Sequence, residues 1–221
     1  FFLQAEDGIR DLVRSRGLGD VYKRQVNAVV HHLSIEKFVL VGHSMGGYAA
    51  LAFASLFIKS LAGLVLFHST PNPDTDEKRV HREQEVHLVE QGKKEQIVRL
   101  SVPKGFANDS LDKFSHWVDY AMSIGMRTPD AGIAACLRGM SERNDSNALL
   151  ASINVPTMLI FGSKDNHIAL PVAQAIAERY PQHESVFLEG SGHMGFFEEE
   201  EVAKRTLLDF NARAFRGTFV L

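Results

Sequence analysis

The sequence predicts an α/β protein with a parallel sheet and a large helical insertion. Two short apolar segments, residues 35–41 and 61–68, are separated by an alanine-rich segment that is typical of a helix. This order of strand, helix and strand is characteristic of a βαβ unit. The apolar pattern resumes at residues 155–162, after a long stretch of different character. We therefore expect one sheet whose strands come from the sequence before and after an insertion.

The elements before the insertion follow from their apolar patterning. Residues 26–33 carry valine and leucine on one helical face and predict the end of a helix. Residues 35–41 end in four apolar residues, as expected for a strand that helices cover on both faces. A glycine-rich turn over residues 42–47 precedes a predicted helix over residues 48–58. Residues 61–68 predict the second strand.

Residues 71–153 predict the insertion, a helical cap or lid rather than a separate domain. They are charged, contain few β-branched runs and open with a Pro-Asn-Pro-Asp break. Thr128 and Pro129 predict a helix start, with threonine as N-cap and proline at the first position. A stripe of apolar residues predicts the helix before it. The stripe consists of Leu111, Phe114, Val118, Ala121 and Met122.

The α/β pattern after the insertion completes the predicted core, which comprises residues 26–70 and 154–221. We expect a strand over residues 155–162, a helix over residues 171–180 and a short strand over residues 185–188. A final helix is expected from Glu198 to about Phe215. Its acidic opening, Glu198–Glu201, is interpreted as a solvated first turn, where negative charge suits the helix dipole.

Composition narrows the range of partners. Hydrophobic and charged fractions of 45% and 23% are ordinary for a globular protein and exclude wholesale disorder. The net charge is −3 and no long run of Lys and Arg occurs, so nucleic acid is not an expected partner. Apolar runs such as residues 61–67 fall short of the about 20 residues that span a bilayer. The lone Cys136 excludes an internal disulfide and favours a cytoplasmic location. Oligomeric state stays open.

The strongest chemical signal is Gly42-His43-Ser44-Met45-Gly46, a G-x-S-x-G pattern between an apolar strand and a small-residue helix. A nucleophilic serine at such a turn sits on strained backbone and projects its hydroxyl outward. Glycines two residues before and after it remove Cβ atoms that would clash. The helix N-terminus adds unpaired N–H groups and a positive dipole end. The alternative is a glycine-rich turn with an incidental serine.

A serine nucleophile needs a base, and the base needs an orienting carboxylate. Asp165 follows the strand over residues 155–162, and His193 follows the strand over residues 185–188 between glycines. The carboxyl ends of parallel strands meet at one edge, where active sites gather. The order Ser, Asp, His is the one that this scaffold uses. Individually, Asp165 could be a turn residue and His193 a loop histidine.

With these residues in place, the chain resembles the serine-hydrolase branch of the α/β-hydrolase superfamily from residue 26 to residue 221. The resemblance rests on VGHSMGGYAALAFA, LVLFHSTP, VPTMLIFGSKDNHI and EGSGHMGFFEEE. It implies an α/β-hydrolase fold with a helical cap, Ser44 as nucleophile, and His193 as general base and then acid. Asp165 would fix the imidazole tautomer. It also implies a small ester or related acyl substrate and no cofactor.

The sequence departs from that superfamily in its opening. Family members have several strands before the serine, and a His-Gly-type loop among them supplies one oxyanion N–H. Nothing before Ser44 matches that loop, so the backbone N–H of Met45 is the oxyanion donor expected from this chain. Residues 1–25 resemble translated sequencing adapter and are expected to be foreign. We therefore expect a C-terminal part of a hydrolase without its N-terminal strands.

Other residues are candidates with two interpretations each. His43 is expected to pack or bond locally within the turn. A metal site is not expected, since no H-E-x-x-H occurs and His81 and His87 are poorly aligned for one ion. Five residues could line the substrate pocket or belong to the packing of the strand end and cap. These are His68, Phe106, Trp117, Met126 and His167.

Three functions remain open at this point. The first is a cofactor-independent hydrolase of small acyl compounds. The second is a binding protein or sensor that carries the same three residues, which would show slow or single-turnover chemistry. The third is an inactive fragment, which would show neither turnover nor a ligand-dependent response.

Overall fold

The structure, a computed structural model, describes residues 18–216, with side chains from residue 24 onward. Its centre is a four-stranded sheet in the order β1-β2-β3-β4, and each neighbouring pair is parallel. The α/β class and the parallel sheet predicted from apolar patterning are therefore confirmed. The strands are β1 (Phe38–His43), β2 (Leu61–Phe67), β3 (Thr157–Gly162) and β4 (Glu184–Leu188).

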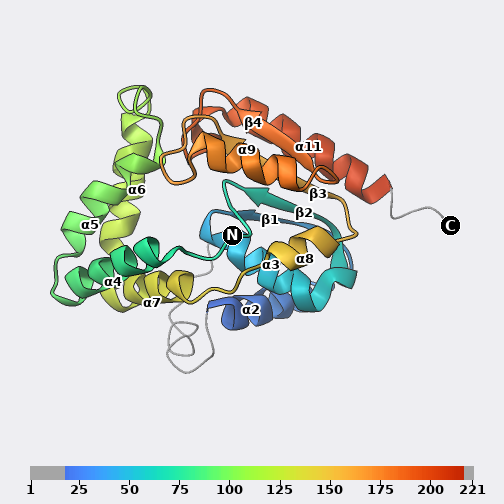
Figure 1. Ribbon diagram of the computed structural model, residues 1–221, viewed down its shortest axis with the longest axis horizontal. Coiled ribbons are helices and arrows are strands. Elements are labelled where there is room, and N and C mark those ends of the chain that lie inside the picture. The colour runs from blue at the N-terminus through green and yellow to red at the C-terminus, as the bar shows by residue number, and fades with distance from the viewer. Residues whose placement is uncertain (1–17, 217–221) are drawn as a thin grey trace.

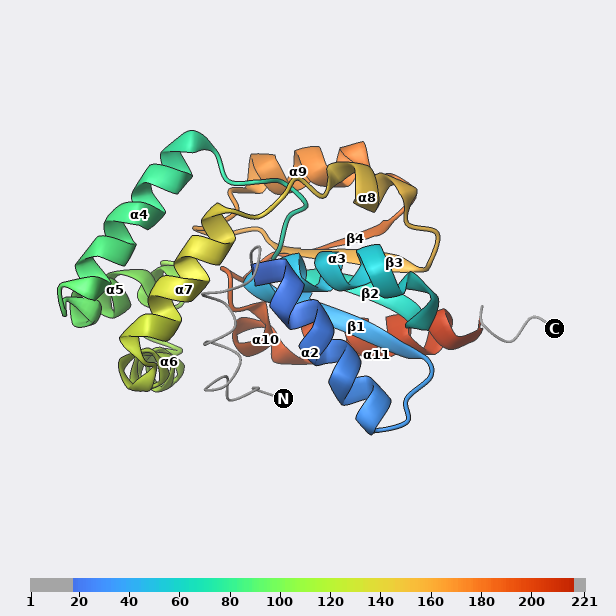
Figure 2. The same cartoon turned by 90° about the horizontal axis from the view of Figure 1, so that it is seen from below.

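Helices cover the sheet on both faces. One face packs against α3 (Met45–Phe57), α8 (Asn147–Ser152) and α9 (Leu170–Arg179) in a cluster that includes Phe53 and Leu159. The other face packs against α11 (Glu200–Arg216), which Figure 2 shows on the opposite side of the sheet from α3 and α9. All residues of β2 and β3 are buried, which explains why their sequences are continuous apolar runs. An earlier helix, α2 (Leu18–His32), packs on α3.

The predicted insertion, residues 71–153, lies between β2 and β3 in the chain, but its last helix, α8, packs with the core on the sheet. Figure 1 shows four of its helices gathered beyond one end of the sheet. No helix among residues 18–216 is long and apolar enough to cross a membrane. The four helices are α4 (Asp76–Glu90), α5 (Lys94–Ser101), α6 (Ser115–Arg127) and α7 (Asp130–Ser141).

The entry and exit of the insertion are joined by ion pairs and hydrogen bonds. Asp74 is buried and pairs with both Arg82 and Arg143, and the Arg143–Asp74 distance is 2.7 Å. Ser146 donates its backbone N–H to the carbonyl of Pro71 at 2.9 Å. The insertion is thus anchored to the core at its base.

Two details of the helix predictions are wrong. The first turn of α7 begins after Pro129, whose carbonyl accepts the N–H of Ile133, so Pro129 and not Thr128 is the N-cap. The Thr128 hydroxyl donates to the Ile124 carbonyl instead and belongs to the end of α6. The predicted apolar stripe is also only partly helical, because Leu111 and Phe114 precede α6.

The acidic segment after His193 also differs from expectation. It is split into α10 (Gly195–Glu198) and α11, with Glu199 in a non-helical conformation between them. Glu198 is 7% exposed and hydrogen-bonded rather than solvated. The physical reason is that three hydrogen-bond donors from other segments converge on its carboxylate.

Candidate active site

Ser44 occupies the sharp turn between β1 and α3. Its φ of 51° and ψ of −118° are strained for a residue with a side chain. The turn is held by the Ser44 N–H, which donates to the Phe67 carbonyl of β2 at 2.9 Å. At Gly42 a Cβ atom would lie 2.5 Å from the Gly46 carbonyl oxygen, so only glycine allows the helix to approach the strand.

The expectation that both flanking glycines avoid a clash holds at one position only. A Cβ atom at Gly46 would meet nothing within 4 Å. At the next residue, Gly47, it would lie 2.2 Å from Ser69 Oγ. The close approach of α3 to the sheet thus depends on Gly42 and Gly47 rather than on Gly46.

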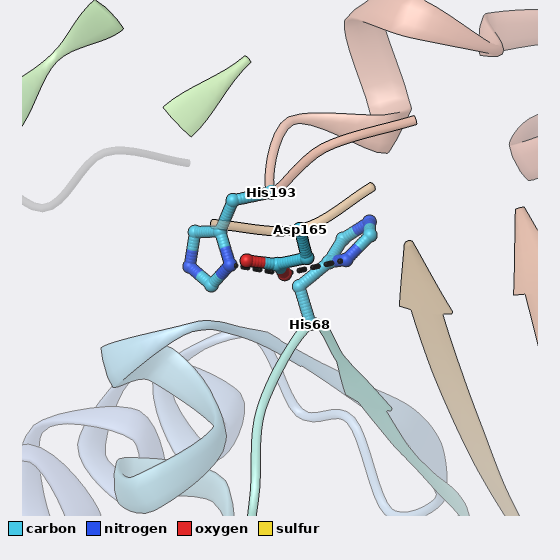
Figure 3. Close-up of side chains that lie close together, drawn as sticks. All are labelled: His68, Asp165 and His193. Atoms are coloured by element: carbon cyan, nitrogen blue, oxygen red, sulfur yellow. Dashed lines mark hydrogen bonds and ion pairs between the residues drawn. The ribbon is translucent and has the colours of Figure 1, made fainter. Parts of the chain in front are cut away.

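The structure brings Ser44, His193 and Asp165 into one hydrogen-bonded chain. His193 Nε2 lies 2.7 Å from Ser44 Oγ, and His193 Nδ1 lies 2.7 Å from Asp165 Oδ2. Figure 3 shows the second of these contacts. Because an ionised carboxylate only accepts, Nδ1 carries the imidazole proton and Nε2 is left to accept from the serine hydroxyl. The arrangement can therefore remove a proton from Ser44.

Asp165 is held in its ionised form by its surroundings. It is 6% exposed, and its Oδ1 accepts the backbone N–H groups of His167 and Ile168 at 2.7 and 2.9 Å. Burial alone would raise the pKa of Asp165, but the hydrogen bond from His193, the nearby His68 imidazole and the backbone N–H of Ile168 outweigh it and hold the pKa far below its usual range. A permanent negative charge thus faces His193 Nδ1.

The backbone of His193 is fixed from two sides. Its N–H donates to the Gly105 carbonyl of the insertion at 2.7 Å, and its carbonyl accepts from His43 Nε2 at 2.8 Å. Burial, with the neighbouring His193 charge, lowers the pKa of His43 to about 3, so this ring is neutral at pH 7. The hydrogen bond of His43 therefore reaches the loop of His193, 150 residues further along the chain, rather than a group within its own turn.

His68 lies on the side of the Asp165 carboxylate that is opposite His193. Figure 3 shows Asp165 between the imidazoles of His68 and His193. His68 is fully buried at a φ of 47°, its Nδ1 lies 3.4 Å from Asp165 Oδ2, and neither ring nitrogen has a hydrogen-bond partner. Burial lowers the pKa of His68, although Asp165 opposes this effect. A neutral ring at this position packs against the carboxylate.

Among the described residues, His68, Asp165 and His193 form a group that could be considered as a metal site. The ligand atoms of His68, Asp165 and His193 all lie within 4.8 Å of one another. Tetrahedral zinc with bonds of about 2 Å separates its ligand atoms by about 3.3 Å. The 2.7 Å between His193 Nδ1 and Asp165 Oδ2 is instead a hydrogen-bond length. This spacing suits a shared proton better than a metal ion.

The remaining pocket candidates lie at different distances from these residues. The His167 ring centroid is 4.8 Å from that of His193. Trp117 stacks on Phe197 at 4.3 Å between centroids, and Phe106 is fully buried near the same ring. Met126, in the last turn of α6, is 40% exposed. Contact of these side chains with a substrate stays a prediction.

Met45 is the first residue of α3, so its N–H has no carbonyl partner within the helix. Met45 lies next to Ser44 at the positive end of the helix, and its role as an oxyanion donor stays a prediction. Two residues near the site were not predicted to lie there. These are Glu198, whose burial depends on distant segments, and Asn166, whose Nδ2 donates to the Phe106 carbonyl at 3.0 Å.

The chain is similar to known proteins over most of its length. A family model described as "Alpha/beta hydrolase family" matches residues 7–205. This range includes much of the opening segment, residues 1–25, whose foreign origin stays a prediction. A thermophilic esterase from Thermogutta terrifontis, solved with malate bound, superposes with a TM-score of 0.84 and 26% identity over 90% of this chain and 74% of the esterase.

Sequence relatives are more distant but extensive. The AB hydrolase superfamily protein YisY of Bacillus subtilis is 26% identical over 201 residues, which are 87% of this chain and 73% of YisY. A 2-hydroxy-6-oxononadienedioate/2-hydroxy-6-oxononatrienedioate hydrolase of Klebsiella pneumoniae is 22% identical over 219 residues, which are 92% of this chain and 72% of that enzyme. The chain spans only 64% of a Haemophilus influenzae relative.

Proposed function

The chain belongs to the alpha/beta hydrolase family, and from that premise we propose that it is a serine hydrolase of small esters or related acyl compounds. The observation that carries the proposal is the hydrogen-bonded chain from Ser44 through His193 to Asp165, with 2.7 Å at each step. The names of an esterase and a dienedioate hydrolase among its relatives support acyl transfer to water.

In the proposed mechanism, Ser44 Oγ attacks the carbonyl carbon of the substrate as His193 Nε2 takes the hydroxyl proton. The tetrahedral intermediate places its negative charge on the former carbonyl oxygen, near the Met45 N–H. The intermediate collapses to an acyl-serine, and His193 gives its proton to the leaving alcohol. Asp165 stays ionised throughout and stabilises the imidazolium.

The second half of the cycle repeats these steps with water. His193 Nε2 accepts a proton from water, and the resulting oxygen nucleophile attacks the acyl carbon. Collapse of the second intermediate releases the carboxylic acid and returns the proton to Ser44 Oγ. No cofactor takes part in any of these steps.

The test is covalent labelling by a fluorophosphonate, which phosphonylates an activated serine and releases fluoride. We expect the wild-type chain to be labelled at Ser44 and the Ser44→Ala variant to remain unlabelled, with intact mass locating the adduct. Labelling of Ser44→Ala at the wild-type rate would remove Ser44 as the nucleophile.

Turnover separates an enzyme from a sensor with the same three residues. With p-nitrophenyl acetate in large excess, an enzyme releases many equivalents of p-nitrophenol per chain. Release that stops at one equivalent would favour the sensor, and no release by a folded, unlabelled chain would favour an inactive fragment.

A further inference from the structure

Glu198 connects two segments that are far apart in the chain. Its Oε1 accepts the Ala107 N–H at 2.8 Å and lies 2.5 Å from the Ser110 hydroxyl, both in the insertion. Its Oε2 accepts the N–H of Gly192, the residue before His193, at 2.8 Å. Glu198 is only 7% exposed. One buried carboxylate thus joins the insertion to the histidine loop.

The two segments are also in direct backbone contact. His193 donates its N–H to the Gly105 carbonyl at 2.7 Å. A Cβ atom at Gly192 would lie 2.5 Å from Ala107 N and 2.6 Å from the Phe106 carbonyl carbon. The loop therefore accepts no side chain at Gly192 while the insertion holds this position.

The loop that follows β3 contacts the same part of the insertion. Asn166, next to Asp165, donates through Nδ2 to the carbonyls of Phe106 at 3.0 Å and Lys104 at 3.3 Å. Lys164 pairs with Asp109 at 2.5 Å. Residues 104–110, which we call the contact segment, are thus bound by the loops that carry both Asp165 and His193.

Because one buried carboxylate accepts from both segments, its contacts with the insertion and with the histidine loop are expected to form and break together. If the contact segment moved away, Glu198 would lose the Ala107 and Ser110 donors in one movement, and each lost hydrogen bond to a charged group costs more than one between neutral groups. The Gly192 N–H and the His193 N–H would lose their geometry in the same movement. The position of His193 is therefore tied to the position of the insertion.

We propose that Glu198 is a positioning residue that locks the contact segment to the loop of His193, so that the imidazole is aligned with Ser44 only when the insertion is seated. The inference rests on the proposed role of His193 as the base. It assigns to the insertion a part in catalysis beyond covering the substrate.

Glu199 provides a matched control on the same loop. Its Oε2 accepts the Gly190 N–H at 2.9 Å and lies 2.5 Å from the Ser191 hydroxyl. Both partners belong to the histidine loop and neither to the insertion. A change at Glu199 therefore loosens the loop without releasing the contact segment. Glu200, which is exposed, serves as a second control for the loss of one negative charge.

The experiment compares Glu198→Gln, Glu199→Gln and Glu200→Gln in the full chain by hydrogen–deuterium exchange and by fluorophosphonate labelling. Glu198→Gln should raise exchange together in peptides that cover residues 104–110 and 190–194. Glu199→Gln should raise it in the second peptide alone, and Glu200→Gln in neither. The labelling amplitude reports the folded fraction, whereas the rate constant of the folded molecules reports alignment.

We expect the labelling rate constant to fall by about 10- to 100-fold in Glu198→Gln, as for a catalytic group displaced by about 1 Å. Should that variant fold poorly, Ser110→Ala removes one insertion donor and leaves the loop intact. It should lower the same rate constant by a smaller factor. Where Glu198→Gln does fold, the effects of the two substitutions should not be additive.

The outcomes separate this inference from the proposed function. Wild-type labelling rates in both Glu198→Gln and Ser110→Ala, in a chain that labels at Ser44, would overturn the lock and leave the hydrolase proposal standing. If the wild-type chain is not labelled at all, the hydrolase proposal fails. Exchange that rises in one segment without the other in Glu198→Gln would overturn the lock whether or not the chain is active.

Discussion

At the scale of single residues, the site depends on charges and tautomers that hydrogen bonds between buried groups determine. Asp165 keeps a negative charge against His193 because backbone N–H groups and two imidazoles surround it. The same charge selects the tautomer of His193 that can accept from Ser44. Small changes of donor and acceptor at this point should have large effects on the reaction and small effects on the fold.

Asp165→Asn tests the choice of tautomer. An asparagine amide that donates to Nδ1 favours the proton on Nε2, which then cannot accept from the Ser44 hydroxyl. We expect kcat for ester hydrolysis to fall by up to about 10⁴-fold with the circular dichroism spectrum unchanged. Near-normal turnover would contradict the assignment of Asp165, and a lost spectrum would mean that the residue is needed for folding first.

His43 gives the fold a pH dependence of known sign. Its pKa is about 3 in the folded chain, against 6.5 for an ordinary histidine, so the unfolded chain binds the additional proton between these values. Stability is therefore unaffected above pH 6.5 and falls as the pH decreases through this window. Between pH 7.5 and pH 5, protonation linked to His43 should lower the free energy of unfolding by about 2 kcal/mol.

The measurement is urea unfolding at both pH values for wild type and His43→Gln, whose amide can still donate to the His193 carbonyl. The variant should lose about 2 kcal/mol less than the wild type over the same interval. An equal loss in both proteins would show that other groups cause the acid sensitivity.

At the scale of elements, the junction of β1, α3 and β2 depends on the spacing between helix and sheet. The helix can approach because Gly42 and Gly47 have no side chains, and Ser69 uses the space to donate to the Ser44 carbonyl at 2.8 Å. The strain at Ser44 is held by these contacts. Tight packing at this junction is thus part of how the serine is presented.

Gly46→Ala and Gly47→Ala form a matched pair for this junction. A Cβ at Gly47 would overlap Ser69, which should cost about 1–3 kcal/mol of unfolding free energy. A Cβ at Gly46 meets open space, and alanine should stabilise the helix there by about 0.5–1 kcal/mol. Urea denaturation measures both, and equal effects of the two substitutions would contradict the packing argument.

At the scale of the whole molecule, the contacts between the insertion and the core include two sets of buried polar interactions. The base of the insertion is joined through Asp74 to Arg82 and Arg143, and Arg143 also lies over the Tyr48 ring at 4.1 Å. Burial raises the pKa of Asp74, but its two arginine partners outweigh this and lower it. Its far part is joined through the contact segment to the two loops of the site.

Asp74→Asn tests the attachment at the base. The neutral amide cannot compensate the charge of two guanidinium groups, and the carboxylate that it replaces is fully buried. The free energy of unfolding should therefore fall by about 3–5 kcal/mol. Asp76→Asn is the control, because that side chain is 98% exposed and its pair with Arg79 should contribute less than about 1 kcal/mol. Thermal or urea unfolding of both variants checks the difference, and equal losses would refute the role of Asp74.

Much of the fold and the three side chains of the proposed triad could be predicted because their signals are local. The apolar runs of β2 and β3 reflect burial on both faces. Neighbouring glycines and small residues indicate the turn at Ser44, and Asp165 and His193 each lie in the loop that follows a strand. Boundaries that depend on competing caps, such as Thr128, were less predictable, because a hydroxyl can serve either of two helices.

The sequence by itself therefore determined the α/β class, the parallel strands and the order of Ser44, Asp165 and His193 along the chain. Only the tertiary structure decided that His68 packs behind Asp165 and that Glu198 is buried between Ala107 and Gly192. The reason is physical. Periodicity and turn chemistry act between near neighbours, whereas the partners of Glu198 lie as far as 91 residues away and meet it only after the insertion packs on the sheet.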